Sequence, residues 1–109
     1  MKKIIITILF ALFYYLPVNL SAEIKTISEG NVDAKVKIII YESLTCSHCA
    51  SFHKNVYPGL KEEFIDKGYV YIEFRNFPLD MAAMNASKIA HCRNDGGSEV
   101  LHYLLRIRK

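Results

Sequence analysis

The chain has 109 residues, which is enough for one domain at most. Its 14 Lys and Arg residues exceed its 11 Asp and Glu residues by a formal charge of +3, and no stripe of basic residues with interleaved aromatics runs along it. Composition and charge therefore give no reason to expect a nucleic acid as a partner.

The first 22 residues have the pattern of an export signal. Lys2 and Lys3 form a short basic start, residues 4–16 are an uninterrupted apolar run, and small residues precede an expected cleavage after Ala22. The apolar run is shorter than the roughly 20 residues that a membrane-spanning helix needs. We predict a signal peptide over residues 1–22, a domain over 23–109, and a periplasmic location, with an uncleaved membrane anchor as the alternative.

Two extended segments are expected before the first cysteine. Residues 22–28 fit a short edge strand or an ordered arm, and residues 29–34 collect Gly, Asn and Asp as turns do. Residues 35–43 contain Val36 and three consecutive isoleucines. Such a run favours a strand that is covered on both faces, as in a parallel sheet.

A helix is expected next, with Thr45 as its N-cap and Gly68 just beyond its end. Pro58 lies inside the pattern and should kink or split the helix, because its ring removes one backbone hydrogen bond. Apolar residues at spacings of three and four predict one buried face. They are Cys49, Phe52, Val56, Leu60 and Phe64.

Residues 69–77 alternate apolar and polar side chains and predict a second strand. Strand, helix and strand at this spacing predict a right-handed βαβ unit, which places the cysteines at the carboxyl edge of the sheet. An Ala-rich helix over 81–93 is expected to begin at Asp80, and a last helix is expected to begin at Ser98. The fold class predicted is therefore α/β.

Cys46 and Cys49 stand where the first strand gives way to the helix. Free amides of the first helical turn and the helix dipole favour a thiolate at Cys46, and this can lower the pKa of such a cysteine to roughly 3.5–7.5. We predict that Cys46 is the exposed attacking thiol and that Cys49, at the start of the apolar face, resolves the reaction. His48 adds a donor and, when protonated, a positive charge, and a stabilised reduced form makes the disulfide a stronger oxidant.

Other interpretations of these residues stay open. The two cysteines could be small core residues, or two ligands of a metal site completed by some of His48, His53, His91 and Cys92, although no second spacing typical of zinc sites is present. His53 is expected at the surface, and Cys92 is expected to be a buried small residue of the Ala-rich helix. Glu42 is either a solvated carboxylate at the strand end or an acid that relays the proton of Cys49.

Residues 36–80 resemble the exported DsbA-like branch of the thioredoxin superfamily. The resemblance rests on the Cys-Ser-His-Cys centre (46–49), the Ala-Ser-Phe-His continuation (50–53) and Arg-Asn-Phe-Pro-Leu-Asp (75–80) after the second strand. It implies that Cys46 is the nucleophile, that Cys49 is the resolving cysteine and that Ser47 and His48 tune the pair. Ser47 stands where most such oxidases have a proline.

The resemblance also implies a function. Members transfer a disulfide to reduced or unfolded exported proteins, are reoxidised by a membrane-bound partner and need no diffusible cofactor. A complete member continues with two antiparallel strands, the first after a cis-proline, and a final helix. No proline follows Pro78 here. We therefore expect a thioredoxin-like βαβ unit and the start of a helical insertion, without the C-terminal half of the fold.

This departure leaves two further expectations. The chain is of low stability or binds another chain that supplies the missing strands, because a small sheet leaves an edge unpaired. A catalytically impaired remnant of such an enzyme is the alternative function, and a small metal-binding module is the third.

Overall fold

The computed structural model describes residues 23–108, so the predicted signal peptide lies outside the described residues. No helix within residues 23–108 combines the length and the apolar character needed to cross a membrane. The elements in chain order are β1 (Ile27–Gly30), β2 (Val36–Glu42), α2 (Ser47–Asn55), α3 (Tyr57–Leu60), the π-helical turn η1 (Lys61–Ile65), β3 (Val70–Asn76), α4 (Met81–Ala90) and α5 (Glu99–Ile107).

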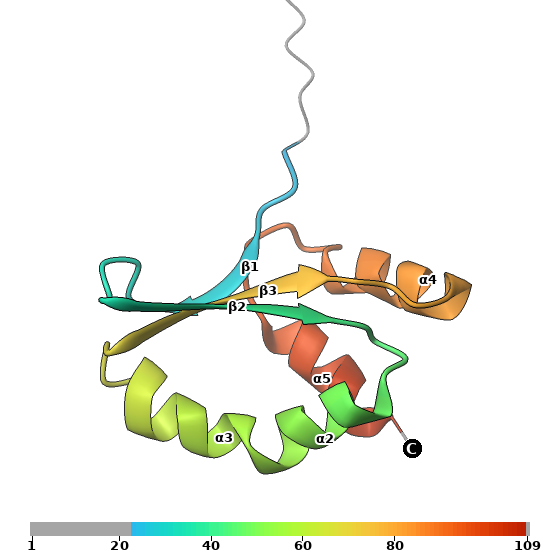
Figure 1. Ribbon diagram of the computed structural model, residues 1–109. Helices are drawn as coiled ribbons and strands as arrows, with labels where there is room; N and C mark the ends of the chain where they lie inside the picture. Colours follow the sequence, from blue (N-terminus) through green and yellow to red (C-terminus); the bar gives the residue numbers. More distant parts are fainter. Residues whose placement is uncertain (1–22, 109) are drawn as a thin grey trace, which may run out of the picture.

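The three strands form one sheet in the order β1-β3-β2 (Figure 1). Strands β2 and β3 are parallel, with Val36 opposite Val70 and Glu42 opposite Asn76, so the predicted βαβ unit is confirmed. Strand β1 runs antiparallel to β3. The predicted arm is therefore an edge strand, and it extends into the predicted turn as far as Gly30, where a Cβ atom would come within 2.3 Å of the Val70 carbonyl oxygen.

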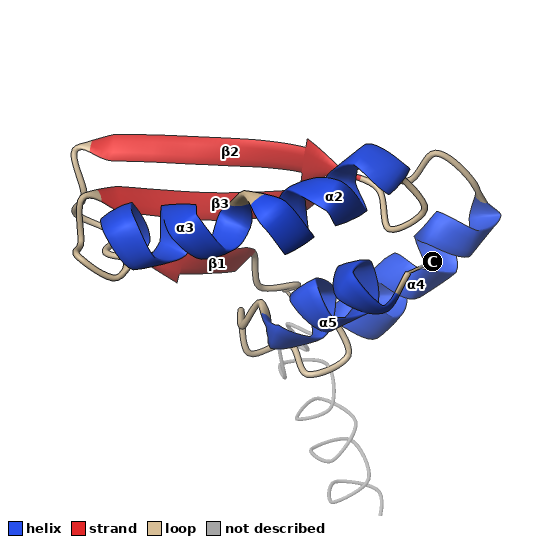
Figure 2. Ribbon diagram, turned by 90° about the horizontal axis from the view of Figure 1, so that it is seen from below, coloured by secondary structure: helices blue, strands red, loops and turns tan. Residues whose placement is uncertain are grey.

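The core lies on one face of the sheet. Helices α2, α3 and α5 pack beneath the strands, as Figures 1 and 2 show from two directions. Successive residues of a strand point to opposite faces. Val70, Ile72 and Phe74 of β3 are accordingly buried beneath the helices, and Ile38 and Ile40 of β2 pack against the same core.

The opposite face of β2 is open, so the expectation of a strand covered on both faces is wrong for residues 23–108. Ile39 is 47% exposed and Tyr41 is 60% exposed. Helices α2, α3 and α5 lie on the other side of the sheet, α4 lies beyond its end, and β2 is one of its two edge strands. Of the three consecutive isoleucines, Ile38 and Ile40 therefore face the core and Ile39 faces solvent.

The helix after the cysteines is split, as the position of Pro58 predicts, but the split falls at Val56. The break turns the buried face, so Val56 and Phe64 are exposed, against expectation. Tyr57 and Ile65 are buried in their place. Gly68 follows the helical segment with a positive φ of 77°, as expected of a residue that ends a helix.

The last two helices begin near the predicted residues. Asp80 caps α4, since its Oδ1 accepts a hydrogen bond from the Ala83 N–H at 2.7 Å. Ser98 occupies the N-cap position of α5, but its hydroxyl donates to Glu29 of β1 rather than capping the helix. Leu101 and Leu105 join the core and hold α5 beside α2.

Candidate active site

A short loop fixes the position of the first cysteine. The Cys46 N–H donates to the Ser43 carbonyl at 3.0 Å, and the Ser43 hydroxyl accepts from the Leu79 N–H at 3.3 Å. The Thr45 hydroxyl donates to Asp80 Oδ2 at 2.7 Å. Thr45 is therefore not the predicted N-cap, because its hydroxyl ties the loop to the start of α4.

Cys46 is itself the N-cap of α2. Its Sγ accepts a hydrogen bond from the Cys49 N–H at 3.3 Å. The pKa of Cys46 is lowered from its ordinary value by a hydrogen bond from the Cys49 thiol, by the amides of Cys49 and His48, and by the positive charge of Arg108. The site thus favours the thiolate at this sulfur, in the way that helix N-termini do.

Cys49 has the opposite character, although it lies only one helical turn away. Burial raises the pKa of Cys49, and the hydrogen bond to Cys46 and the negative charges of Cys46 and Glu42 raise it further. Both cysteines are free thiols in the structure. The pair therefore combines a sulfur that ionises readily with a neighbour that holds its proton.

A cavity of about 260 Å³ lies against the second cysteine. We call it the active-site cavity; its lining residues are Ile40, Glu42, His48, Cys49 and Phe52. His48 is exposed, as is Ser47 before it. The structure thus brings four of the predicted site residues, Cys46, Ser47, His48 and Cys49, into one turn of helix, and places Glu42 across the cavity.

Glu42 is buried, so the interpretation as a solvated strand-end carboxylate is wrong. Its Oε2 lies 2.6 Å from Nε2 of His53. Its other oxygen, Oε1, is buried and has no hydrogen-bond partner among the described residues. Glu42 and Cys49 line the same cavity, so this unpartnered oxygen lies near the second thiol.

His53 is only 1% exposed, so the prediction of a surface histidine is wrong. Its Nδ1 lies 2.8 Å from Nδ1 of His102 in α5. The local sequence does not show that α2 buries Ala50 and His53 rather than a simple apolar stripe. It also does not show that α5, whose His102 is 49 residues further along the chain, covers His53. His102 and its partner Glu29 were likewise missed, because only the tertiary fold joins them.

One more expectation needs correction. Cys92 is exposed, because α4 ends at Ala90 and Cys92 lies in the turn that follows. Arg108, just after α5, lies along α2, where its carbonyl accepts from Lys54 Nζ at 3.2 Å and one guanidinium nitrogen is buried. Its charge acts on Cys46 from there.

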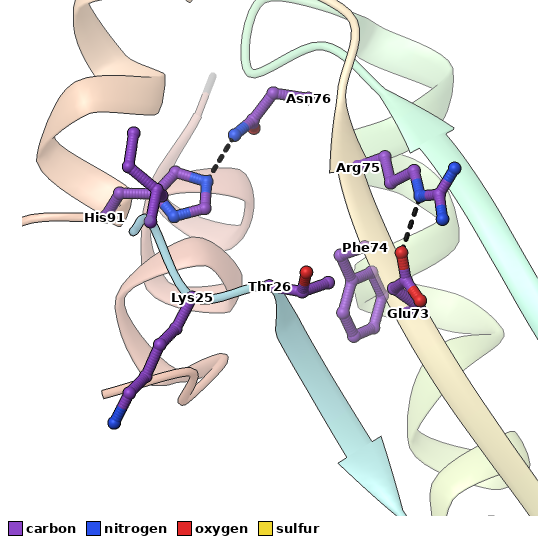
Figure 3. A pocket seen from close by; sticks show the side chains of 8 residues that line it. Lys25, Thr26, Glu73, Phe74, Arg75, Asn76 and His91 are labelled. Carbon is purple, nitrogen blue, oxygen red and sulfur yellow. Dashed lines mark hydrogen bonds and ion pairs between the residues drawn. The ribbon is translucent and has the colours of Figure 1, made fainter. Parts of the chain in front are cut away.

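A larger cavity of about 330 Å³ lies beside the N-terminal arm and contains no thiol (Figure 3). Its polar groups bind one another: Asn76 Nδ2 donates to His91 Nε2 at 2.6 Å, and Arg75 Nε donates to Glu73 at 2.5 Å. Within residues 23–108, no group of three or more His, Cys, Asp or Glu side chains is placed to hold a metal ion. The cysteine pair therefore remains the candidate centre.

Comparison with known sequences identifies the family of the chain. The family model described as Thioredoxin matches residues 22–107. A protein of Rickettsia bellii named as a protein-disulfide oxidoreductase is 35% identical over 74 residues, which are 68% of this chain and 29% of the relative. A protein of Bacillus cereus named as a disulfide bond formation protein D is 45% identical over 52 residues, or 48% of this chain and 24% of that one.

Solved structures show the same fold. The alpha-DsbA1 protein of Wolbachia pipientis superposes with a TM-score of 0.69 at 32% identity, over 86% of this chain and 46% of that one. DsbA of Chlamydia trachomatis superposes with a TM-score of 0.68 at 23% identity, over 82% and 50%. The chain thus spans less than a third of the length of the curated relatives and about half the length of the solved ones.

Proposed function

The chain belongs to the thioredoxin family, in its DsbA-like branch, and on this premise we propose that it is a thiol–disulfide oxidoreductase whose redox centre is Cys46 and Cys49. One observation carries the proposal. Two thiols one turn apart have opposite acidities, with the pKa of Cys46 lowered and that of Cys49 raised. A structural pair of cysteines has no need of this difference, whereas an attacking and a resolving thiol require it.

The oxidised pair donates its disulfide in two exchanges. A substrate thiolate attacks Sγ of Cys46, the substrate–Cys46 bond forms, and the Cys46–Cys49 bond breaks with its electron pair going to Cys49, which takes up a proton. A second substrate thiolate then attacks the substrate sulfur of the mixed disulfide, and Cys46 leaves as a thiolate. The lowered pKa of Cys46 makes it a good leaving group in that last step.

Three further residues have roles in the proposal. Ser47 and His48 tune the pair: they form the first turn of α2, and the His48 amide favours the Cys46 thiolate. Glu42 exchanges a proton with Cys49, because both line the active-site cavity and Oε1 of Glu42 is free to accept one.

Disulfide transfer from the purified chain tests the function. The oxidised chain is mixed with a reduced, unfolded protein, and substrate disulfides are counted after an acid quench. We expect transfer that is lost in Cys46→Ala and retained in Cys92→Ala, since Cys92 is exposed and outside the pair. Equal transfer by both variants, or none by the unaltered chain, would remove the enzymatic claim.

The cellular setting follows from the relatives and from the sequence pattern. We infer that residues 1–22 are a signal peptide, that the domain over 23–109 acts in the periplasm, that its substrates are reduced or unfolded exported proteins, and that a membrane-bound partner reoxidises it. Outside the cytoplasm disulfides persist, so a disulfide donor is useful there. Detection of the chain in a periplasmic extract, with Glu23 as its first residue, would support this setting.

A chain that supplies further strands fits the open edge of β2. Val36, Ile39 and Tyr41 are exposed on this strand, and the open edge has backbone groups free to pair with another strand. The same exposed surface favours the second candidate, a catalytically impaired remnant of such an enzyme. The transfer assay separates the two, because a remnant transfers no disulfide whether or not Cys46 is present.

A further inference from the structure

Four buried or half-buried side chains form a continuous hydrogen-bonded chain behind the cysteine pair. We call them the buried relay: Glu42 of β2, His53 of α2, His102 of α5 and Glu29 of β1. Glu42 Oε2 lies 2.6 Å from His53 Nε2, the two Nδ1 atoms of His53 and His102 lie 2.8 Å apart, and His102 Nε2 lies 2.9 Å from Glu29 Oε1. Each histidine uses both ring nitrogens, so the chain has no gap.

The two ends of the relay open into different cavities. Glu42 lines the active-site cavity beside Cys49. At the other end, Glu29 and His102 line a second cavity of about 300 Å³, to which Lys61 also contributes. Lys61 Nζ lies 2.8 Å from Glu29 Oε2, and its side chain is 43% exposed, so this end reaches water. In the middle, His53 is 1% exposed and His102 is 8% exposed, and both also line the second cavity.

Hydrogen bonds at all three contacts of the relay require one proton more than two ionised carboxylates and two neutral imidazoles carry. Three hydrogen bonds join the four groups, and each needs one proton between its two heavy atoms. Two ionised carboxylates and two neutral imidazoles supply only two. The third proton resides on one of the carboxylates or makes one imidazole an imidazolium, and the positions it can occupy run from Glu42 to Glu29.

We propose that the buried relay conducts protons between Cys49 and the second cavity, and that His53 and His102 are positioning and proton-carrying residues for the resolving thiol. The proposal rests on the redox function proposed above. It goes beyond Glu42 as a local acid, because Glu42 is only 3% exposed and its Oε2 lies against His53, so the relay gives its proton a second route to water.

The transfer balances at every group. In the arrangement with the third proton on Glu42 Oε2, Glu42 Oε1 takes the proton of Cys49 as Cys49 becomes a thiolate. In the same movement the Oε2 proton passes to His53 Nε2, the Nδ1 proton of His53 passes to His102 Nδ1, and the Nε2 proton of His102 passes to Glu29. Each imidazole gains one proton and loses one, and Glu29 releases its proton to water. The reverse sequence protonates Cys49 when it leaves as a thiolate.

The surroundings favour release at the Glu29 end. Burial opposes the ionised form of Glu29, but donors from His102, Lys61 and Ser98 outweigh it and hold the pKa of Glu29 well below its usual range. Other titratable or charged groups of the second cavity come from several elements. They are Tyr57 of α3, Lys61 of η1, and Glu99 and Arg106 of α5, with Asp66 bound to Lys61 beyond the cavity.

Ring closure with glutathione isolates the step that uses Cys49. In a Cys92→Ala background, the reduced chain is mixed with glutathione disulfide, quenched with acid and weighed by mass spectrometry. The Cys46 thiolate attacks one glutathione sulfur and releases the other as a thiolate. Cys49 then loses its proton and attacks Cys46 Sγ, the Cys46–Cys49 bond forms, and the Cys46–glutathione bond breaks with its electron pair on the leaving glutathione.

We expect His53→Gln and His102→Gln each to slow ring closure about tenfold or more, since proton transfer by positioned groups contributes roughly 10²–10⁴-fold to such steps. The rate of the first step, the attack of Cys46 on glutathione disulfide, should stay within about twofold of its rate in the chain with both histidines. His91→Gln is the matched control, because His91 binds Asn76 outside the relay. Closure in both relay variants that matches the control would overturn the proposal.

A measurement on the unaltered histidines covers the case in which a variant fails to fold. The ring-closure rate, plotted against the fraction of heavy water in the solvent, should fall along a curve, because several protons move together. A straight line would overturn the relay. If no glutathione forms a bond to Cys46, the redox function itself fails and the relay falls with it. Adduct formation with unaltered closure removes the relay alone.

Discussion

At the scale of single residues, position in the fold gives equal side chains unequal chemistry. Cys46 caps a helix, whereas Cys49 is more buried and lies near a buried carboxylate, and their pKa values shift in opposite directions. The histidines divide in the same way. His48 is exposed at the mouth of the active-site cavity, whereas His53 is sealed between Glu42 and His102.

Replacing His53 should cost stability. His53→Leu fills a similar volume but leaves Glu42 buried without its hydrogen-bond partner, and we expect a loss of about 3 kcal/mol in the free energy of unfolding. Urea denaturation of the reduced chain measures this. His91→Leu, which removes a single partly buried hydrogen bond, should cost less than about 1 kcal/mol. Equal losses in the two variants would show that the buried contacts of His53 stabilise little.

The two cysteines should also make the stability of the reduced chain depend on pH. Because the folded pKa of Cys46 is below its ordinary 9.0, its contribution is present at and above pH 9.0 and is lost as the pH falls through the folded value. The folded pKa of Cys49 is raised, so its contribution is complete below pH 9.0 and is lost as the pH rises through the folded value.

Unfolding free energies measured from about pH 6 to about pH 9 should therefore rise more steeply in the unaltered chain than in Cys46→Ser. Serine also caps helices well, so the variant removes the ionisable thiol and keeps the cap. Parallel pH curves for the two proteins would contradict the lowered pKa of Cys46.

At the scale of elements, periodicity predicted the order of strands and helices but not their buried faces. The alternation over residues 69–77 identified β3 and its apolar side, because a period of two is unambiguous when one face is buried. The helix after the cysteines has a break at Val56, which rotates the rest of the segment. A sequence pattern read with one fixed period cannot include that rotation.

Two isoleucines in neighbouring strands test which face of the sheet is the core. Ile72 is 0% exposed in β3, and Ile39 is 47% exposed in β2. We expect Ile72→Ala to lower the free energy of unfolding by about 3 kcal/mol and Ile39→Ala by less than about 1 kcal/mol. Similar losses in the isolated chain would mean that both faces of the sheet are covered.

The candidate site shows where prediction from sequence stops. The cysteine pair, its tuning residues and Glu42 lie within eight residues, so the strand-to-helix junction alone brings them together. His102 and Glu29 lie 73 residues apart and meet only because α5 packs beneath the sheet. Their partnership depends on long-range packing, which local patterns do not encode.

At the scale of the whole molecule, one covered face leaves an apolar surface on the other. Ile39 and Tyr41 are exposed together on this face of β2, an edge strand. Edge strands with apolar side chains pair with other chains unless charges or covering elements prevent it. Whatever binds this face in the cell, the isolated chain presents it to solvent.

Association of the purified chain should therefore depend on this surface. We expect sedimentation velocity to show larger species as the concentration rises, and Ile39→Lys to shift the population towards the monomer, because a lysine on an edge strand opposes pairing. Val32→Lys, at an exposed apolar residue in the turn before β2, is the matched control and should leave association unchanged. Equal effects of both lysines would point to net charge as the cause.

The most direct test is the rate at which iodoacetamide alkylates Cys46 as the pH is varied, measured in a Cys92→Ala background with peptide mapping to identify the modified sulfur. The account predicts that the rate reaches half its maximum below pH 9.0, the ordinary pKa of a cysteine, and that Cys49 stays unmodified over the same range. A midpoint at or above that value for Cys46, or faster alkylation of Cys49, would contradict it.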